Sequence, residues 1–499
     1  MFERISPEQA GIPSRAVLKF IKTLEGYKLN THSIIMSRGD KIFSECYYAP
    51  FDKDFKHRMS SVSKSFVGVA VGLLIEDGRM RLSAPLMSYL PEYMGDAAAV
   101  GDSCYLSAMT VEDALEMQTC KSKASRLNWL KAELEDRAES YFKVGYDRPS
   151  GAVFEYDSQV SFLLGVIVEK ITGMPFLDFL KERFLTKCGF SEDSHCLKCP
   201  GGHSFGDSGV LCSARDLLIF ARFVMNGGTW EGVRYMDEGY LREATSKKTA
   251  SSIEDYGAYD SYGYGYQIWK APRDGFAFIG MGDQLAICDR LTDFIFIINS
   301  DNRGYGYSRT IIYHALYDYI VEALGEPLPE NPADYGELLE YEKSRRLCFA
   351  SGDVSSPFAD EISGVTFALD GNPMGITRFK LDFCGDEGVF SYTNGQGDKE
   401  LRFGFGKNIF QMFPQYGYPD EVMTVSEPNH RYGCAVSAEW REEKKLHLKV
   451  QLIDKHFGVL DILFSFKGDG VLVAMEKTAE SILDKYCGYA NGRSVEALC

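Results

Sequence analysis

The spacing of apolar residues in the first two thirds of the chain predicts several buried or amphipathic helices. Apolar positions that recur every three or four residues indicate a helix, because they lie on one face of it. The sequence has this spacing over Ser14–Leu24, Ser65–Asp77, Phe162–Ile171, Asp216–Met225 and Ser308–Leu324.

Strand-like segments occur before and after these helices, at the two ends of the same region. Short apolar runs bounded by turn residues are typical of strands, and Ser37–Asp40 has the composition of a hairpin turn. The predicted strands are Ser33–Met36, Lys41–Cys46, Tyr262–Lys270, Phe276–Ile279, Gln284–Cys288 and Phe294–Asn299. Strands from both ends with helices between them predict one sheet flanked by helices, an α+β domain.

The pattern changes after Glu326–Pro332, a proline-rich stretch with the composition of a linker, and a short charged helix, Ala333–Arg346, follows it. Beyond Gly352, apolar and polar residues alternate with a period of two, for example in Leu446–Leu452. This alternation predicts an all-β barrel or sandwich. We therefore expect a first domain over 1–325, a linker with a short helix over 326–352 and a β domain over 353–499.

Composition and charge limit the classes of function. The 499 residues exceed the size at which a single core stops growing, so more than one domain is expected. With 45% hydrophobic and 25% charged residues, the composition is that of a soluble globular protein. The net charge of -17 argues against nucleic acid or an anionic membrane as a partner. The most apolar run, Phe66–Ile75, is too short to span a bilayer.

The N-terminal residues and the cysteines bear on the cellular compartment. No basic region followed by an apolar stretch occurs at the start, so no signal peptide is predicted. Thirteen cysteines without export indicate free thiols in a reducing compartment, and the odd number argues against a fully paired set of disulfides. We therefore expect a cytoplasmic protein.

The candidate chemistry begins with Ser61 and Lys64, just before and within a helix-like apolar run. Residues three apart lie on one face of a helix, so the two side chains would be neighbours. A serine hydroxyl becomes a good nucleophile when a neighbouring base takes its proton, and a lysine amine can be that base. The free N–H groups of a helix start favour a developing oxyanion. Alone, the same spacing also fits a helix-capping serine with an exposed lysine.

Two further elements extend this candidate site. Tyr156 precedes a predicted helix, and a tyrosine near a serine–lysine pair can move protons to and from the serine. Gly280 and Gly282 lie between two predicted strands, where glycines permit close approach of a ligand to a strand edge. The N–H group of Met281 could then join that of Ser61 as an oxyanion hole. Taken alone, Tyr156 is better explained as one packed tyrosine among 29, and the glycines could equally form a glycine-rich hairpin turn.

The order and spacing of these elements resemble the penicillin-recognising serine hydrolases. That family includes class C β-lactamases, D-alanyl-D-alanine carboxypeptidases, related esterases and 6-aminohexanoate-oligomer hydrolases. The resemblance extends from about Ile5 to Gly325. The segments that carry it are Arg58–Phe66, Tyr156–Ser158, Phe162–Gly165, Thr172–Gly173, Gly209–Leu217 and Phe278–Gln284.

The resemblance implies a β-lactamase-like fold, an antiparallel sheet flanked by helices with a helical subdomain. It implies that Ser61 is the acylated nucleophile, that Lys64 and Tyr156 share proton transfer, and that Ser61 contributes an oxyanion N–H group. The substrate-binding or oxyanion residues that it implies are Ser158, Phe278, Gly280 and Met281. The C-terminal β region resembles the lipocalin-like barrel that some members carry.

Three positions depart from the family pattern. Ser158 replaces the usual asparagine, and a hydroxyl reaches less far and donates one hydrogen. Phe278 stands where many members carry a lysine or histidine that faces the carboxylate of β-lactams and peptides, which favours a neutral or apolar acyl group here. Cys120 replaces the glycine that ends a turn in the family.

Two other serine motifs offer alternatives. Gly202–Gly206 has the Gly-x-Ser-x-Gly form of an α/β-hydrolase elbow around Ser204, but the predicted elements lack the strand before it and the helix after it. Gly206–Gly209 has the Gly-Asp-Ser-Gly form of the trypsin nucleophile, without an upstream histidine block to supply a base.

A zinc site and an aromatic cleft are also compatible with parts of the sequence. His195, Cys196, Cys199 and His203 could supply four ligands, but a lone Cys-x-x-Cys pair in a loop fits free thiols better. Tyr262–Tyr266 either lines a substrate cleft or packs on the sheet as an aromatic strand. We expect no metal and no cofactor.

Together these features predict a serine hydrolase that cleaves an amide or ester through an acyl-serine intermediate. The expected substrate is a small molecule or short peptide, such as an amino-acid-derived amide. The alternative from another class is a catalytically weak or inactive protein of the same fold that binds a ligand. The positions of Lys64 and Tyr156 relative to Ser61 distinguish the two hypotheses.

Overall fold

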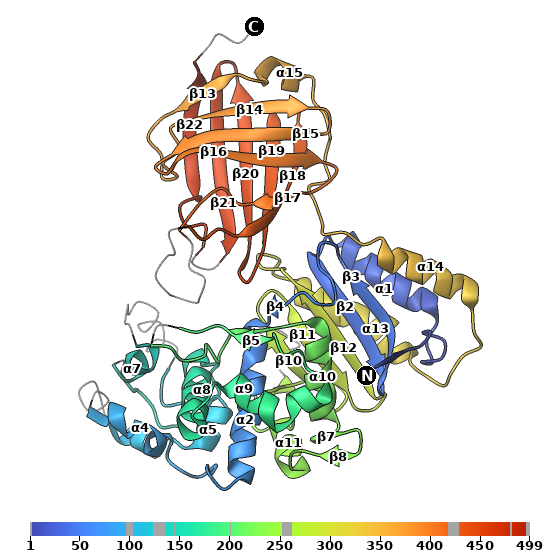
Figure 1. The fold of residues 1–499 in the computed structure, drawn as a ribbon, viewed down its shortest axis with the longest axis vertical. Helices are drawn as coiled ribbons and strands as arrows, with labels where there is room; N and C mark the ends of the chain where they lie inside the picture. Colours follow the sequence, from blue (N-terminus) through green and yellow to red (C-terminus); the bar gives the residue numbers. More distant parts are fainter. Residues whose placement is uncertain are drawn as a thin grey trace. The chain divides into compact units, whose positions relative to one another are not determined.

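The fold is taken from a computed structural model, which describes residues 2–95, 103–122, 136–143, 145–199, 201–251, 262–417, 429–479 and 482–495. These residues form two compact units, one up to Arg346 and the other from Leu347 onward. Figure 1 shows both units as a ribbon coloured along the chain.

The first unit is built on a seven-stranded sheet whose strands come from both ends of that unit. In sheet order the strands are β1 (Glu3–Arg4), β3 (Lys41–Tyr47), β2 (Thr31–Arg38), β12 (Phe294–Ser300), β11 (Gln284–Asp289), β10 (Phe276–Gly280) and β9 (Trp269–Lys270). Strand β2 pairs with β12 in an antiparallel register that sets Ile34 opposite Ile298, and this pairing joins the early hairpin to the late strands. Only β1 and β3 run parallel.

The helices of the first unit begin and end at recognisable sequence signals. They are α1 (Ser14–Gly26), α2 (Ser63–Glu76), α4 (Ser103–Ala108), α5 (Val111–Leu115), α7 (Arg137–Phe142), α8 (Ser158–Thr172), α9 (Phe176–Leu180), α10 (Ala214–Met225), α11 (Glu238–Ala244), α13 (Ser308–Tyr319) and α14 (Pro332–Lys343). The Asp157 side chain caps the start of α8, and Gly173 ends that helix with a φ of 79°. Ser213 and Asp216 form a capping box at the start of α10.

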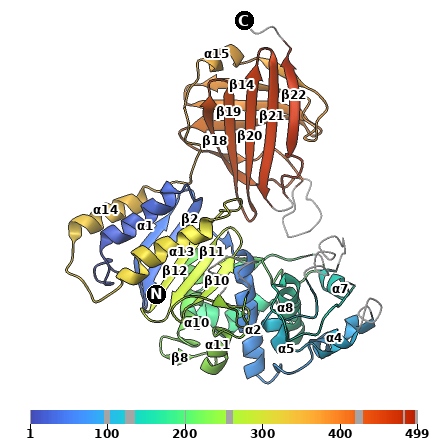
Figure 2. The ribbon, with the colours of Figure 1, turned by 180° about the vertical axis from the view of Figure 1, so that it is seen from behind.

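Helices cover both faces of the sheet, as predicted. On one face Phe20 of α1 packs edge-on against Phe296 of β12, with 5.5 Å between ring centres. On the other face Phe220 of α10 packs against Phe278 of β10 at 5.1 Å. Figures 1 and 2 view these two faces in turn, with α1 and α13 in front of the sheet in Figure 2. The sheet is therefore buried on both sides, and α2, α5, α8 and α9 form the helical subdomain beside it.

One predicted strand is wrong. The pattern indicated a continuous strand over Tyr262–Lys270, but only Trp269–Lys270 pairs with β10. Gly263 and Gln267 have positive φ angles of 123° and 60°, which an extended strand does not allow. A side chain at Gly265 would also clash with the main-chain oxygen of Ala244, so this segment folds as a tightly packed loop.

Helix α14, near the end of the first unit, packs on elements close to the N-terminus. Asp334 forms an ion pair of 2.8 Å with Arg15 of α1, and Glu342 accepts a hydrogen bond from Ser44 of β3 at 2.7 Å. Tyr341 bonds to Glu25 at the end of α1. These contacts tie the helix to two elements near the N-terminus.

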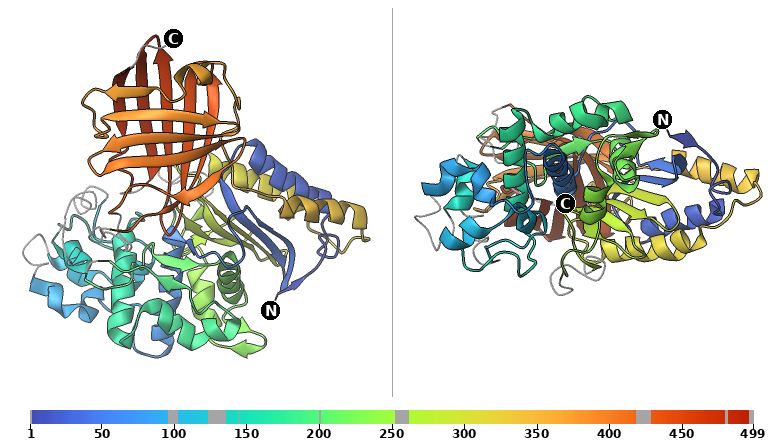
Figure 3. Two further views of the ribbon diagram at one scale, coloured as in Figure 1. Left: turned by 45° about the horizontal axis from the view of Figure 1, so that its top comes forward. Right: turned by 90° about the horizontal axis from the view of Figure 1, so that it is seen from below.

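The second unit is a closed β-barrel, which decides between the predicted barrel and sandwich. Around the ring the strands are β16 (Gly397–Phe405), β15 (Glu387–Asn394), β14 (Arg378–Cys384), β13 (Thr366–Leu369), β22 (Gly488–Ser494), β21 (Gly470–Ala479), β20 (Phe457–Lys467), β19 (Lys445–Ile453) and β18 (Gly433–Glu442). A short parallel pairing between β16 and β18 closes the ring, and β17 (Ile409–Met412) pairs with β18 as well. Strands β14 to β16 cross the strands of the opposite wall (Figures 1 and 3).

One result concerns membranes. In the described ranges no single helix is both long and apolar enough to cross a bilayer. A single pair, Ser158–Thr172 with Phe176–Cys188, reaches the required length and composition only when combined, and it is bent by 64°.

Candidate active site

Ser61 lies in a short 3-10 turn, Ser60–Val62, that leads directly into α2. Ser60 has a φ of 47°, an unusual value for a residue with a side chain. The Ser63 hydroxyl donates to the main-chain oxygen of Ser60 at 2.7 Å and accepts from the N–H group of Val210 at 3.0 Å. Val210 begins β6 (Val210–Cys212), so the turn that carries Ser61 is held between a helix and a strand.

Lys64 contacts both other members of the predicted catalytic group. Its Nζ atom donates to Ser61 Oγ at 3.0 Å and lies 5.1 Å from the centre of the Tyr156 ring. It also donates to the main-chain oxygen of Asp207 at 2.7 Å, and the lysine is 1% exposed. Within the described part of the chain, no carboxylate lies at ion-pair distance from it. A hydroxyl, a carbonyl and an aromatic face therefore surround this nitrogen.

Asp207 also holds a buried ion pair. Its carboxylate lies 3.2 Å from the guanidinium of Arg137 on α7, and both side chains are buried. The guanidinium of Arg137 stacks over Phe205 at 4.3 Å. Sequence reasoning missed both residues as parts of the site. The Gly-Asp-Ser-Gly segment, taken there as a false nucleophile motif, supplies the carbonyl that orients Lys64.

Tyr156 is held by neighbouring aromatic rings. Its ring stacks on Trp269 with 5.6 Å between centres and an interplanar angle of 19°. Tyr264 packs almost perpendicular to both, at 6.3 Å from Tyr156 and 4.8 Å from Trp269. The sequence allowed Tyr262–Tyr266 either to line a substrate cleft or to pack on the sheet as a strand. Tyr264 is a packed residue, although its segment is a loop and not a strand.

A second support lies beneath α2. Gln267 is buried with a φ of 60°, and its main-chain oxygen accepts a hydrogen bond from Ser65 of α2 at 2.8 Å. Its side chain accepts from Ser161 of α8 at 2.5 Å and donates to the carbonyl of Leu115 in α5 at 3.0 Å. One residue thus fixes three helices near the nucleophile, and no sequence motif signals it.

The glycine motif approaches the nucleophile turn closely. A side chain at Gly280, the last residue of β10, would clash with the main-chain oxygen of Met59, two residues before Ser61. Met281 follows at the start of a turn and is 42% exposed. Gly282 and Asp283 continue the turn with positive φ angles of 76° and 66°. The end of β10 therefore packs against the segment that carries Ser61.

One of the predicted substrate-binding residues, Phe278, is a core residue. Phe278 is 0% exposed and packs between Phe220 and Phe276, so its ring belongs to the core and offers no surface to a substrate. The prediction that the Phe278 side chain contacts the substrate is therefore wrong. Its ring faces α10 and packs in the core. Ser158 is half-buried as the first residue of α8, directly after the capping Asp157.

Cys120 replaces a family glycine without exposing its thiol. Its Sγ atom lies 3.8 Å from the sulfur of Met109, and the side chain is fully buried. Burial raises the pKa of the Cys120 thiol to about 12.

The alternative motifs have other partners. Ser204 is buried in a loop between β5 (His195–Cys196) and β6, which is not the strand-to-helix turn of an elbow. The carbonyl of Ser208 accepts a hydrogen bond from Arg58 at 3.0 Å. His203 Nδ1 lies 3.0 Å from a carboxylate oxygen of Glu169, which raises the pKa of that histidine. No group of three or more His, Cys, Asp or Glu side chains in the described ranges is arranged to hold a metal.

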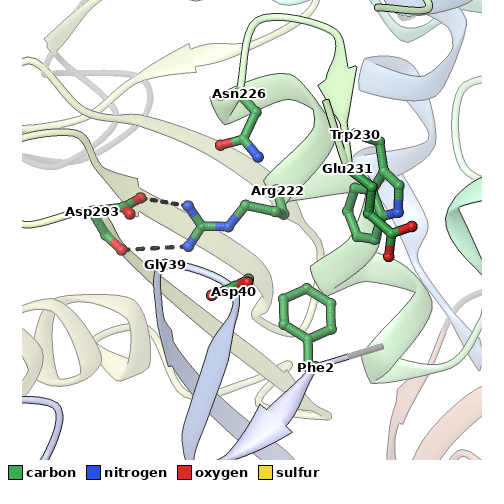
Figure 4. A pocket seen from close by; sticks show the side chains of 8 residues that line it. All are labelled: Phe2, Gly39, Asp40, Arg222, Asn226, Trp230, Glu231 and Asp293. Carbon is green, nitrogen blue, oxygen red and sulfur yellow. Dashed lines mark hydrogen bonds and ion pairs between the residues drawn. The ribbon is translucent and has the colours of Figure 1, made fainter. Parts of the chain in front are cut away.

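A pocket of about 380 Å³ lies at the other end of the sheet. Figure 4 shows Arg222 at its centre, bonded to Asp293, with Phe2 and Trp230 at one side. Asp293 directly precedes β12 at the end where β11 finishes, whereas Gly280 faces the beginning of β11. This pocket is therefore separate from the Ser61 turn.

The fold defines the class of protein. An antiparallel sheet covered by helices on both faces, with a helical subdomain, is the fold of the β-lactamase-related serine hydrolases. The family model described as Beta-lactamase matches residues 19–309, more than half of the chain, and the chain belongs to this family. It is thus a β-lactamase-related serine hydrolase.

Individual relatives agree with this assignment. The 6-aminohexanoate-dimer hydrolase of Paenarthrobacter ureafaciens is 29% identical over 283 residues, which cover 54% of this chain and 71% of that protein. A Bacillus anthracis structure provisionally named a 6-aminohexanoate-dimer hydrolase superposes with a TM-score of 0.54 at 17% identity, over 66% of this chain and 89% of that one. The D-amino acid amidase of Ochrobactrum anthropi SV3 has a TM-score of 0.50 at 16% identity, over 62% and 98%.

Proposed function

We propose that the chain hydrolyses a small amide or ester through an acyl intermediate on Ser61. The observation that carries the proposal is the 3.0 Å contact between Lys64 Nζ and Ser61 Oγ, with the lysine almost fully buried. A neutral amine can donate to the Asp207 carbonyl while it accepts the Ser61 proton. Serine and lysine are thereby within the distance that proton transfer requires.

The reaction would run in two steps. In the first, Ser61 Oγ attacks the substrate carbonyl and Lys64 takes its proton. The bond to the leaving amine or alcohol then breaks, and Tyr156 or Lys64 returns a proton to it. The N–H groups of Ser61 and Met281 would receive the oxyanion, and the seating of Gly280 against Met59 supports that arrangement. In the second step, water attacks the acyl-serine, releases the acid and restores the hydroxyl.

The expected substrate class follows from one position in the family pattern. Many relatives carry a cation where this chain has Phe278, and this buried ring supplies no charge to a substrate, so we expect a neutral or apolar acyl group, such as that of a small peptide or amino-acid-derived amide. The Paenarthrobacter relative is named for cleavage of an amide dimer, which is consistent with a small amide substrate. None of the twelve cysteines in the described ranges forms a disulfide, which fits a reducing compartment such as the cytoplasm.

Intact-protein mass spectrometry tests the proposal. A fluorophosphonate should add once to the wild-type chain, and Ser61→Ala should abolish the adduct. Ser204→Ala is the matched control, because Ser204 is the serine of the rival elbow motif, and it should label like wild type. An adduct that persists in Ser61→Ala would overturn the assignment. No adduct in any variant would favour a ligand-binding protein without turnover, and a penicillin adduct on Ser61 would overturn the neutral acyl group.

A further inference from the structure

An open cavity of about 730 Å³ lies at the surface of the second unit, and its volume is within the range of small-molecule sites. It is lined by residues of β14, β15 and β16 and by Pro414, Tyr416 and Arg431, which flank β17 and β18 in sequence. Tyr416 is fixed by two hydrogen bonds with Gln396, one at its N–H group and one at its carbonyl. These bonds hold the main chain of Tyr416 to the turn between β15 and β16.

Two cations meet on the Tyr416 ring. Lys399 of β16 is 7% exposed, and its Nζ atom lies 4.8 Å from the centre of that ring. The guanidinium carbon of Arg431 lies 4.9 Å from the same centre. Among the residues that the structure describes, neither cation has a carboxylate at ion-pair distance. Burying a cation without an anionic partner is costly, and a π face offsets only part of that cost.

The other described charged residues that line the cavity do not form ion pairs with Lys399 or Arg431. Arg378 lies 3.7 Å from Asp398, and Lys380 lies 2.8 Å from Asp382. Glu400 is the remaining carboxylate of the lining and is exposed. Burial first, and the positive charge of Arg431 second, lower the pKa of Lys399, as expected for two like charges that share a site. In a chain of net charge -17, Lys399 and Arg431 thus share a site in which no described carboxylate pairs with either of them.

We propose that this cavity binds a small organic carboxylate. Its two oxygens would bond to Lys399 and Arg431, because a guanidinium matches the geometry of a carboxylate and charge-assisted hydrogen bonds are the strong ones. Its apolar body would lie against Tyr416 and Tyr392, which line the same cavity. The site lies in the second unit and uses none of the residues assigned to hydrolysis. Its test is therefore independent of the role proposed for Ser61.

Calorimetric titration of the full chain with benzoate at constant ionic strength tests the proposal. Wild type should bind, and Lys399→Met and Arg431→Met should each weaken binding about tenfold or more, the usual effect of losing one charged hydrogen bond. Glu400→Gln should bind like wild type, because Glu400 follows Lys399 in β16 and its side chain points to the opposite, exposed face of the sheet. Lys399→Met should keep the wild-type melting temperature or raise it, because it replaces a buried, unpaired cation with an apolar chain of similar length.

Two matched variants separate this site from general charge effects and from catalysis. Lys445→Met removes a positive charge at the opposite end of β18 from Arg431, where Lys445 pairs with Glu442 at 2.7 Å, and should bind benzoate like wild type. Ser61→Ala should also bind like wild type. Absent benzoate binding by wild type, wild-type affinity in both cation variants, or loss of binding in Ser61→Ala would overturn the proposal. Tighter binding of inorganic phosphate than of benzoate would overturn the choice of a carboxylate.

Discussion

The Nζ atom of Lys64 donates a hydrogen bond of 2.7 Å to the main-chain oxygen of Asp207, a residue 143 positions further along the chain. The same residue uses its carboxylate to pair with Arg137 inside the protein. Asp207 therefore connects the proposed catalytic lysine to a buried ion pair. The position of Lys64 depends on a loop that carries none of the proposed chemistry.

Replacing Asp207 tests that dependence. Asp207→Ala leaves the Arg137 guanidinium buried without its partner, and breaking a buried pair in this way costs about 3–5 kcal/mol. We also expect a slower reaction with fluorophosphonate, because the carbonyl that orients Lys64 loses its anchor. Urea unfolding and the rate of labelling measure the two effects.

The control for Asp207→Ala lies on the same helix as Arg137. Glu139 of α7 pairs with Lys143 at the surface, so Glu139→Ala should change the unfolding free energy by only about 0.5 kcal/mol or less. An unfolding free energy for Asp207→Ala as close to wild type as that of the control would contradict the role assigned to the pair.

A second prediction concerns Gly280 and the Ser61 turn. A methyl group at this position would meet the main-chain oxygen of Met59, which cannot yield without moving the Ser61 turn. Displacing a catalytic group by about 1 Å can cost about 10²-fold in rate, so Gly280→Ala should lower kcat/KM by roughly that factor. Steady-state kinetics on a neutral ester substrate, chosen under the proposed function, would measure it.

A glycine elsewhere provides the comparison for Gly280→Ala. Gly336 lies inside α14, where an added methyl group meets nothing within 4 Å. Gly336→Ala should leave kcat/KM unchanged and raise stability by up to about 1 kcal/mol, because alanine favours a helix. Wild-type kinetics in Gly280→Ala would show that β10 does not set the nucleophile turn.

Much of the fold was predictable because local patterns determine it. The helix at Ser63–Glu76 and the strand at Phe294–Ser300 are apolar runs of the expected length and type, and both are buried. The proximity of Ser61 and Lys64 follows from a spacing of three residues. The alternation of apolar residues after Gly352 likewise specifies strands with one inward face.

The rest of the site depends on contacts that no local pattern encodes. Lys64 is oriented by a main-chain carbonyl, which every residue carries, so nothing in the sequence distinguishes Asp207. Gln267 acts through a positive φ and long-range hydrogen bonds to three helices, and the same backbone angle breaks the predicted aromatic strand. The position of Phe278 in a strand did not reveal which face it occupies, and that face turned out to pack on α10.

Two buried histidines, His32 and His57, predict that the free energy of unfolding falls in acid. His57 Nε2 lies 2.9 Å from His32 Nδ1, and burial lowers the pKa of His57 to about 3. In the unfolded chain the pKa is about 6.5, so below that pH the unfolded state takes up a proton that the folded state does not. The stability due to neutral His57 is therefore complete above pH 6.5 and is lost as pH falls, by about 2 kcal/mol at pH 5.

Urea unfolding between pH 7.5 and pH 5 measures this effect. His57→Gln should flatten the dependence on pH by about one proton, although it lowers stability at neutral pH through lost packing. His314→Gln changes an exposed histidine and should retain the wild-type slope. Parallel curves for wild type and His57→Gln would refute the assignment to His57.

The pocket in Figure 4 supplies a last prediction, about stability rather than catalysis. Arg222 is 3% exposed, and the carboxylate of Asp293 balances its charge. Asp293 has a φ of 53°, which asparagine tolerates, so Asp293→Asn removes the charge without straining the backbone. Loss of the charged partner should cost about 1–3 kcal/mol in urea unfolding. Asp40→Asn, at an exposed position of the same pocket, should stay within about 0.5 kcal/mol of wild type. Equal unfolding free energies for Asp293→Asn and Asp40→Asn would show that the buried Arg222 does not depend on the Asp293 carboxylate.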